Sequence, residues 1–222
     1  MMTKPKARTR DGAQRRRELC DAAIEVLAEH GSRGLSHERV DRAAGVPVGS
    51  TSYYYRTRSA LLQGVAARVA EIDTANLQSV LSEPIDTTKP FAHLARLTML
   101  QADGSGLVLN KARHELLLSA ARDPALAETS REFMPRIMAL AQKAIRQLQP
   151  ATQDDALLEA QTTAVTTFLA GVFSRFVAGD RTIGDPDQLA RLFQSIAEAV
   201  ALNQYRTIAS TKAKSRTIAD VP

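Results

Sequence analysis

The chain has 222 residues, of which 44% are hydrophobic, a share that supports a buried core and excludes global disorder. Its single cysteine excludes an internal disulfide framework and a cysteine-rich zinc site. No apolar run reaches the roughly 18 residues of a membrane span, and the basic first segment lacks the apolar stretch of a signal peptide. We therefore expect a cytoplasmic protein with no membrane partner.

The net formal charge of +5 lies entirely in the first quarter of the chain. Residues 1–62 contain 12 Lys and Arg against 7 Asp and Glu, whereas the remaining residues contain 17 of each. Neutralisation of phosphates supplies much of the non-specific affinity of proteins for nucleic acids, so this asymmetry favours a nucleic-acid partner. A solvated basic tail would give the same pattern, and charge alone does not separate the two.

Glycine and proline divide the sequence into segments with helical spacing, and no segment alternates as a sheet strand would. We therefore predict an all-α fold of about nine helices. The first helices are expected over 11–30, ended by Gly31, over 36–44, capped by Ser36, and over 47–55, opened by Pro47. A long helix follows from Arg58, capped by Thr57. Later helices are expected at about 91–102, 107–121, 124–149, 154–178 and 187–204.

Residues 36–62 have the layout of a helix-turn-helix. Gly45 permits a sharp turn, Pro47 fixes the start of the second helix, and apolar positions around Val40 face inward. The second helix carries small or polar residues that let it approach DNA closely. An ordinary bundle could also contain a glycine turn, with residues 53–55, three tyrosines, as core aromatics. The basic charge of the same segment favours DNA.

Residues 31–62 resemble the DNA-binding signature of the TetR family of bacterial regulators. The matching motifs are Ala44-Gly45-Val46, Gly49-Ser50, Tyr53-Tyr54-Tyr55, Thr57-Arg58 and Leu61-Leu62. The resemblance implies a three-helix DNA-binding head followed by a variable regulatory domain. It also implies that Val48, Gly49 and Ser52 face bases and that phosphates are held by Ser36, His37, Ser50, Tyr53, Tyr54 and Arg58.

Two positions depart from the family pattern, which usually has a large aliphatic residue at Thr51 and a tyrosine at Ser52. The base contacts implied by the resemblance are therefore weaker predictions than the phosphate contacts. We divide the chain into a basic flexible arm (1–13), the helix-turn-helix domain (14–62), a helical ligand-binding and dimerisation domain (63–206) and a flexible tail (207–222). The arm could lie along the DNA backbone or enter the minor groove.

The last two long helices carry broad apolar faces, which could be core within one subunit or surface for a second one. TetR-like proteins pair through their last two helices, so the resemblance favours a homodimer, and a two-fold symmetric protein suits a palindromic DNA site. The predicted interface residues are Phe168, Val172, Phe173, Leu189, Phe193 and Ile196.

One stripe of the helix expected over 107–121 combines Asn110 and His114 with Leu117. If this stripe faces the interior, its polar groups need partners, and a small-molecule effector could be one. A position at the solvent boundary explains the same pattern without a ligand.

The sequence contains no zinc-ligand spacing, nucleophile elbow or phosphate-binding loop, so we expect neither catalysis, nor a cofactor, nor a metal. The prediction is a sequence-specific DNA-binding transcriptional regulator, a repressor released from a palindromic double-stranded DNA operator by a small molecule. The alternatives are a helical enzyme and a non-sensing architectural DNA-binding protein, the latter disfavoured by the neutral C-terminal part.

Overall fold

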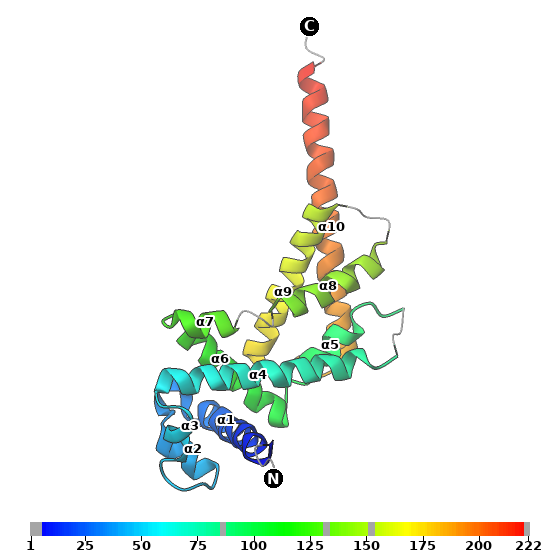
Figure 1. The fold of residues 1–222 in the computed structure, drawn as a ribbon. Coiled ribbons are helices and arrows are strands. Elements are labelled where there is room, and N and C mark those ends of the chain that lie inside the picture. The colour runs from blue at the N-terminus through cyan, green and yellow to red at the C-terminus, as the bar shows by residue number, and fades with distance from the viewer. Residues whose placement is uncertain (1–5, 85–87, 131–133, 151–153, 220–222) are drawn as a thin grey trace. The chain divides into compact units, whose positions relative to one another are not determined.

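The computed structural model describes residues 6–84, 88–130, 134–150 and 154–219, which contain ten helices and no strand (Figure 1). The all-α prediction is confirmed. The chain forms two compact units, Met1–Ser79 with Leu100–Met134 and Val80–Met99 with Pro135–Pro222. This division differs from the predicted boundary at residue 62, because the segment from Leu100 to Met134 packs with the N-terminal helices.

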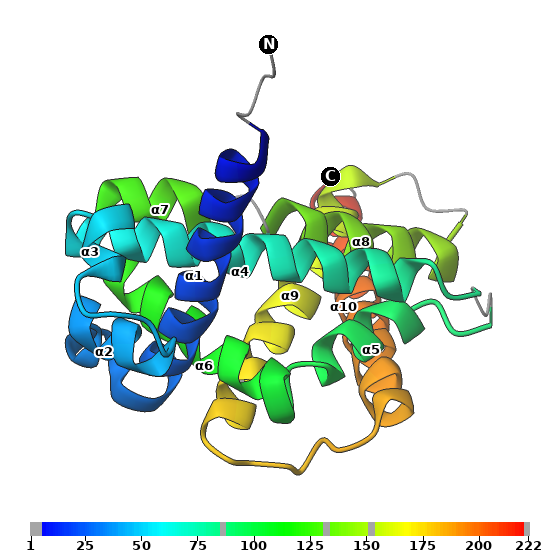
Figure 2. The ribbon, with the colours of Figure 1, turned by 60° about the horizontal axis from the view of Figure 1, so that its bottom comes forward.

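The first unit surrounds one hydrophobic core. In Figure 2, α1 crosses α4, and α2 and α3 lie together beside them. Leu19, Leu27 and Leu61 are fully buried in this core, and α6 contributes Leu109 and Ala112 to it. The helices of this unit are α1 (Lys6–Gly34), α2 (His37–Ala43), α3 (Ser50–Tyr54), most of α4 (Arg58–Leu81), α6 (Gly104–Ala120) and α7 (Pro124–Ser130).

The second unit is a helical bundle with an aromatic centre. Its helices are α5 (Ala92–Met99), α8 (Met134–Leu148), α9 (Asp155–Val177) and α10 (Pro186–Ala219). Phe193 is fully buried, and its ring centroid lies 6.0 Å from that of Phe91 and 5.9 Å from that of Phe168. The buried amide of Gln161 donates to the carbonyl of Ala197 at 2.8 Å, which ties α9 to α10.

Local signals in the sequence correctly placed several helix ends. The Ser36 hydroxyl accepts from the backbone N–H of Arg39 at 3.3 Å, and Thr57 accepts from Ala60 at 3.1 Å, as N-caps do. Asp154 caps α9 in the same way through the N–H of Leu157 at 3.0 Å. The regular helix of α1 breaks at Gly31, where the predicted helix ends.

Other boundaries were predicted wrongly. Helix α1 already begins at Lys6 and α10 continues to Ala219, so residues 6–13 and 207–219, predicted as a flexible arm and tail, are helical. The segment 207–219 contains neither glycine nor proline to stop a helix once α10 has started. The helix expected over 124–149 is two helices, α7 and α8. Residues 1–5 and 220–222 of the predicted arm and tail lie outside the described residues.

Among the described helices, α9 alone has the length and apolar composition that could cross a membrane. One of its faces packs within the bundle through Val165, Leu169, Val172 and Phe176, all buried. The opposite face consists largely of small residues. A helix that packs against protein on both faces has the same apolar composition as a helix that crosses a membrane.

Candidate DNA-binding site and effector cavity

The turn between α2 and α3 is longer than the sequence suggested. Helix α3 begins at Ser50 and not at Pro47, because Gly49 adopts the left-handed conformation (φ 93°) that favours glycine. Pro47 instead starts a tight turn, in which its carbonyl accepts the N–H of Ser50 at 3.1 Å. As a result Val48 projects from the turn with 84% of its surface exposed.

Asp41 fixes this turn from inside the domain. Its side chain is 1% exposed, and one carboxylate oxygen accepts from both the N–H (2.7 Å) and the hydroxyl (2.5 Å) of buried Thr51. The other oxygen accepts from the N–H of Gly49 at 2.7 Å. The carboxylate therefore holds the first turn of α3 at three points. Sequence reasoning missed Asp41 and treated Thr51 only as a departure from the family pattern.

The electrostatics of Asp41 follow from these contacts. Burial by itself would raise the pKa of the carboxyl group, since it disfavours the charged form. The hydrogen bonds from Thr51 and Gly49 stabilise the carboxylate, and together they hold the pKa of Asp41 below its usual range. The residue is therefore an anion at neutral pH, matched by three donors.

All nine side chains or backbone positions predicted to contact DNA are accessible on the first unit. Val48 and Tyr53 are 84% and 79% exposed. The remaining positions are exposed at Ser36, Gly49, Ser52 and Arg58, and partly exposed at His37, Ser50 and Tyr54.

Several of these residues also hydrogen-bond within the protein, and for His37 and Ser50 this restricts what they offer DNA. The His37 ring lies 2.6 Å, through Nε2, from the carbonyl oxygen of Tyr55, which can only accept, so Nε2 carries a proton. In the neutral ring Nδ1 then has no proton and can only accept, while Nε2 anchors the end of α3. The Ser50 hydroxyl donates to the carbonyl of Pro47 at 2.5 Å and can still accept.

The three consecutive tyrosines have three different environments. Tyr53 is exposed, and Tyr54 meets it edge-on at 5.1 Å between ring centroids while the guanidinium of Arg16 lies 5.5 Å over the Tyr54 ring. Tyr55 turns inward, where a side chain at Gly64 would start 2.5 Å from its ring. The sequence could not separate these roles, because all three residues share one type.

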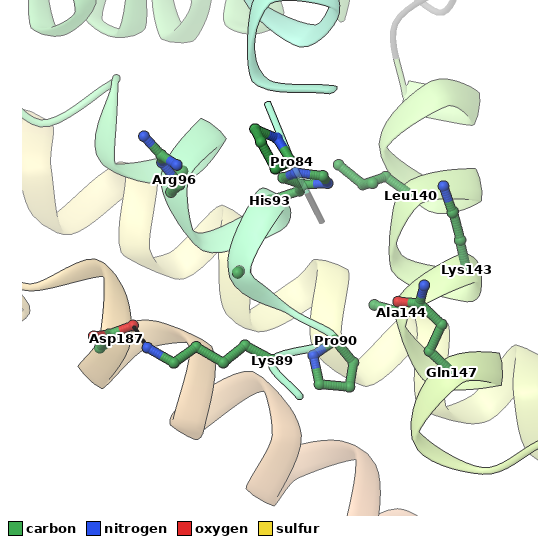
Figure 3. Close-up of a pocket in the computed structure, with 11 residues that line it drawn as sticks. Pro84, Lys89, Pro90, His93, Arg96, Leu140, Lys143, Ala144, Gln147 and Asp187 are labelled. Atoms are coloured by element: carbon green, nitrogen blue, oxygen red, sulfur yellow. Dashed lines mark hydrogen bonds and ion pairs between the residues drawn. The ribbon is translucent and has the colours of Figure 1, made fainter. Parts of the chain in front are cut away.

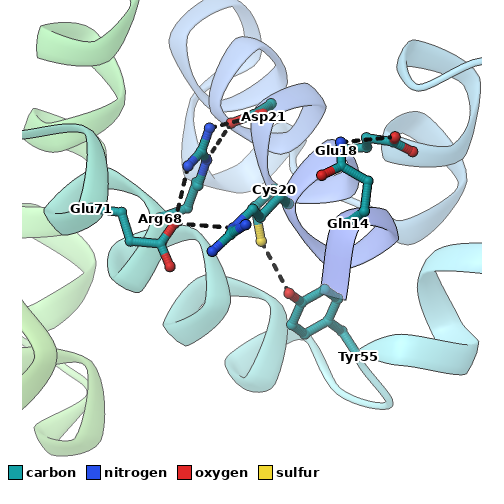
Figure 4. A network of polar contacts seen from close by, with 8 residues as sticks. Gln14, Glu18, Cys20, Asp21, Tyr55, Arg68 and Glu71 are labelled. Atoms are coloured by element: carbon teal, nitrogen blue, oxygen red, sulfur yellow. Dashed lines mark hydrogen bonds and ion pairs between the residues drawn. The ribbon is translucent and has the colours of Figure 1, made fainter. Parts of the chain in front are cut away.

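A network of polar contacts joins α1 to α4 behind this site (Figure 4). Arg68 donates two hydrogen bonds to the Asp21 carboxylate, at 2.7 and 3.2 Å, and pairs with Glu71 at 3.0 Å. Next to it, Cys20 Sγ and Tyr55 Oη lie 3.1 Å apart, and burial raises the pKa of both groups, which stay neutral. Through these contacts Tyr55, which follows α3, is held against α1, and α1 is held against α4.

No family model and no curated protein matches the sequence. Solved structures do match. A member of the TetR family from Streptomyces coelicolor A3 is 25% identical with a TM-score of 0.62, over 82% of this chain and 98% of that one. The multidrug binding protein EbrR in complex with ethidium is 26% identical with a TM-score of 0.58, again over 82% and 98%.

The chain has the fold of the TetR family. A protein from Pseudomonas aeruginosa PAO1, 18% identical, shares this fold with a TM-score of 0.67 over 88% of this chain and 94% of that chain. With this fold and an exposed helix-turn-helix, the protein is a DNA-binding transcriptional regulator of the TetR type.

Half of the predicted dimer interface is core in this TetR fold. Val172, Leu189 and Phe193 are at most 1% exposed within one chain, so a second subunit cannot contact their side chains, and this part of the prediction is wrong. Phe168, Phe173 and Ile196 remain partly exposed.

The predicted pocket on α6 is also corrected. Leu117 is 64% exposed, so it faces solvent and not the interior. Asn110 is fully buried, but its amide donates to the carbonyl of Gln101 at 3.4 Å, and Nδ1 of His114 lies 2.9 Å from the Asn110 carbonyl of its own helix. The protein itself therefore supplies a partner for the Asn110 amide N–H and for the His114 ring, two of the polar groups that had suggested a ligand.

A cavity of about 210 Å³ lies instead within the second unit, between α5 and α8 (Figure 3). Leu140 and Ala144 form its apolar wall on α8, with His93 of α5 across from them. The charged residues of the remaining lining are Lys89, Arg96 and Lys143, together with one acid, Asp187. Lys89 pairs with Asp187 at 3.0 Å, Arg96 pairs with Glu83, and Lys143 makes no ion pair with a described residue.

In the described part of the chain, no group of three or more His, Cys, Asp or Glu side chains is placed to hold a metal ion. The single cysteine, Cys20, is buried and shares a hydrogen bond with Tyr55.

Proposed function

We propose that this protein is a homodimeric repressor that binds an inverted-repeat operator through α3 and leaves it when a small molecule binds the second unit. The observation that carries the proposal is the α2–α3 turn, which presents Val48, Gly49 and Ser52 together outward while Asp41 holds the turn rigid from within. Small exposed groups let the backbone approach base edges, and exposed Tyr53 and Arg58 supply donors for phosphates on the flanks. Nothing in this arrangement resembles a catalytic constellation, which favours binding over the enzyme alternative.

Selection from random duplexes with the pure protein is expected to enrich an inverted repeat. Arg58→Ala should weaken binding to operator and random DNA alike, because a lost phosphate contact removes about 0.9 from the slope of log K against log salt, or about 1.8 for a dimer. Titrations from low to moderate salt measure that slope. Ser52→Ala is the matched comparison, and it should change the selected bases without changing the slope. A single, unrepeated half-site would contradict the dimer, and random sequences would favour the architectural alternative.

The dimer surface proposed here is the outer face of α9. Ala160, Thr163, Thr167 and Gly171 are exposed on it, directly opposite the face that packs within the bundle. Small residues allow close approach of two helices, and partly exposed Ile196 adds an apolar contribution from α10. This face replaces Val172, Leu189 and Phe193 of the sequence prediction, while Phe168 and Phe173 flank it.

The effector site proposed here is the cavity between α5 and α8. A volume of about 210 Å³ is smaller than the 300 to 1,000 Å³ of typical drug sites, so the effector is a small metabolite. EbrR is a multidrug binding protein solved with ethidium. Lys89 and Arg96 are already paired with acids, whereas Lys143 makes no ion pair with a described residue, so the cavity disfavours such a cation and suits a small organic carboxylate.

Among small molecules tested by thermal shift, carboxylates are expected to stabilise the protein and ethidium is not. Lys143→Ala should weaken carboxylate binding on the order of tenfold, because a charge-assisted hydrogen bond contributes about 1.5 kcal/mol or more. Arg146→Ala is the control, since Arg146 lies one turn further along α8 and does not line this cavity. Equal affinity of both variants would place the effector elsewhere. A carboxylate that binds without changing operator affinity would remove the sensing role, because an effector must bind the two states differently.

A further inference from the structure

A second cavity lies in the first unit, beside the helix-turn-helix. It measures about 470 Å³ and is lined by the end of α1, the start of α4 and the turn between α6 and α7. Three arginines border it, Arg33, Arg58 and Arg122, one from each of these segments. We call it the arginine notch.

The charges of the notch leave a cationic excess. Arg58 donates to the carbonyl of Ser32, which fixes its side chain without neutralising it, and neither Arg33 nor Arg122 has an ion pair with a described residue. Asp123 is the acidic residue of the lining. Its carboxylate accepts from the Ser59 hydroxyl at 2.8 Å and from the N–H groups of Ala125 and Leu126 at 3.1 and 3.2 Å.

These hydrogen bonds, of which the one from Ser59 has the largest effect, lower the pKa of Asp123 and keep it charged. They also occupy the oxygens of its carboxylate. Glu115 is the other neighbouring carboxylate, and it accepts the N–H of Ser32 at 2.7 Å. Both acids are therefore engaged by the protein's own donors. Two of the three guanidinium groups are not, and they keep their planar sets of N–H donors, which match the oxygens of a phosphate.

The position of the notch points to a DNA phosphate and not to a free anion. Arg58, which borders the notch, follows the end of α3 by four residues. A duplex bound to α3 carries one phosphate charge per roughly 1.7 Å of its axis, so its backbone runs past the margin of the helix-turn-helix on both sides. Cations within about one Debye length, roughly 10 Å, of that path are attracted to it.

We propose that the arginine notch binds the DNA backbone next to the α3 contact and that Arg122, from the α6–α7 turn, is a phosphate-binding residue. The contact rests on the DNA-binding function proposed above and extends it to a segment outside the helix-turn-helix. Through this contact the DNA affinity depends on the position of α6. Ser119 lines the notch from the last turn of α6, and Arg122 lines it from the residues just after that helix.

The test is the salt dependence of binding to a random duplex by the full-length protein. Arg122→Ala should lower the slope of log K against log salt by about 0.9 per subunit and weaken binding on the order of tenfold at physiological salt. Arg122→Lys should keep the slope, because it keeps the charge. Lys111→Ala is the matched control, since Lys111 lies on α6 and does not line the notch.

An unchanged slope for Arg122→Ala together with a lowered slope for Arg58→Ala would overturn the notch contact and leave the proposed function standing. Unchanged slopes for both would count against the proposed function as well. A thermal shift with inorganic phosphate that Arg122→Ala abolishes, with no effect on DNA binding, would identify a free-anion site and also overturn the inference. Circular dichroism checks the fold of each variant, and exposed Arg122 is not expected to affect it.

Discussion

Asp41→Asn should weaken specific DNA binding about a hundredfold while leaving most of the fold in place. An amide has one acceptor oxygen where the carboxylate has two, so its NH₂ group must face a backbone donor, either Gly49 or Thr51. Loss of a charge-assisted hydrogen bond costs about 1.5 to 3 kcal/mol, and the donor left unsatisfied inside the domain adds to this. If α3 loses its position, DNA affinity falls by about two orders of magnitude, since every 1.4 kcal/mol is tenfold. Operator titration and urea unfolding measure the two effects.

Glu38→Gln is the control, because Glu38 is an exposed acid on the same helix, paired with Arg42 at the surface. The pH dependence gives a second check. The pKa of Asp41 is lowered in the folded state, so its stabilisation is fully present above the unfolded pKa, about 3.9, and disappears as pH falls through the lower folded value. Asp41→Asn should lack this acid-dependent loss. Wild-type operator affinity in Asp41→Asn would show that α3 is positioned by other contacts.

The pair formed by Asp41 and Thr51 shows why part of the site could not be read from the sequence. Caps such as Ser36 and Thr57 bond a backbone group three residues away, so a local pattern suffices to predict them. Asp41 and Thr51 are ten residues apart and meet only once the turn has formed. Thr51 then satisfies a carboxylate inside the domain, which explains a polar residue where the family pattern has an aliphatic one.

The predicted interface failed for a different reason. Apolar spacing on α9 and α10 correctly indicated faces that pack, but it carries no information on whether the partner belongs to the same chain. Val172, Leu189 and Phe193 pack within the bundle, and small residues such as Ala160 and Gly171 are left outside. The pocket on α6 failed similarly, because the partner of Asn110 is the backbone of Gln101, which has no signal in residue type.

Arg113→Met should strongly destabilise the first unit. Arg113 pairs with Asp73 at 2.6 Å, and Asp73 is 3% exposed between α4 and α6. Removal of the arginine leaves a buried, uncompensated carboxylate, which typically costs about 3 to 5 kcal/mol. Asp73→Leu with Arg113→Met removes both charges and should recover much of the loss, since apolar replacements of buried pairs are often neutral or stabilising. Urea unfolding of the single and double variants measures this difference.

The effect of Arg113→Met should also depend on pH in a defined direction. Burial raises the pKa of Asp73 despite the opposing charge and hydrogen bond of Arg113, so without Arg113 the pKa must rise further. When the pKa of a carboxyl group is higher in the folded than in the unfolded state, its charged form destabilises the fold and its protonated form does not. The loss of stability in the variant is therefore complete above the folded pKa and becomes smaller as pH falls toward the unfolded pKa, about 3.9. The difference in unfolding free energy between wild type and Arg113→Met should therefore be smaller at pH 5 than at pH 8. A difference that does not change with pH would mean that the loss comes from the packing of the arginine side chain and not from the buried charge.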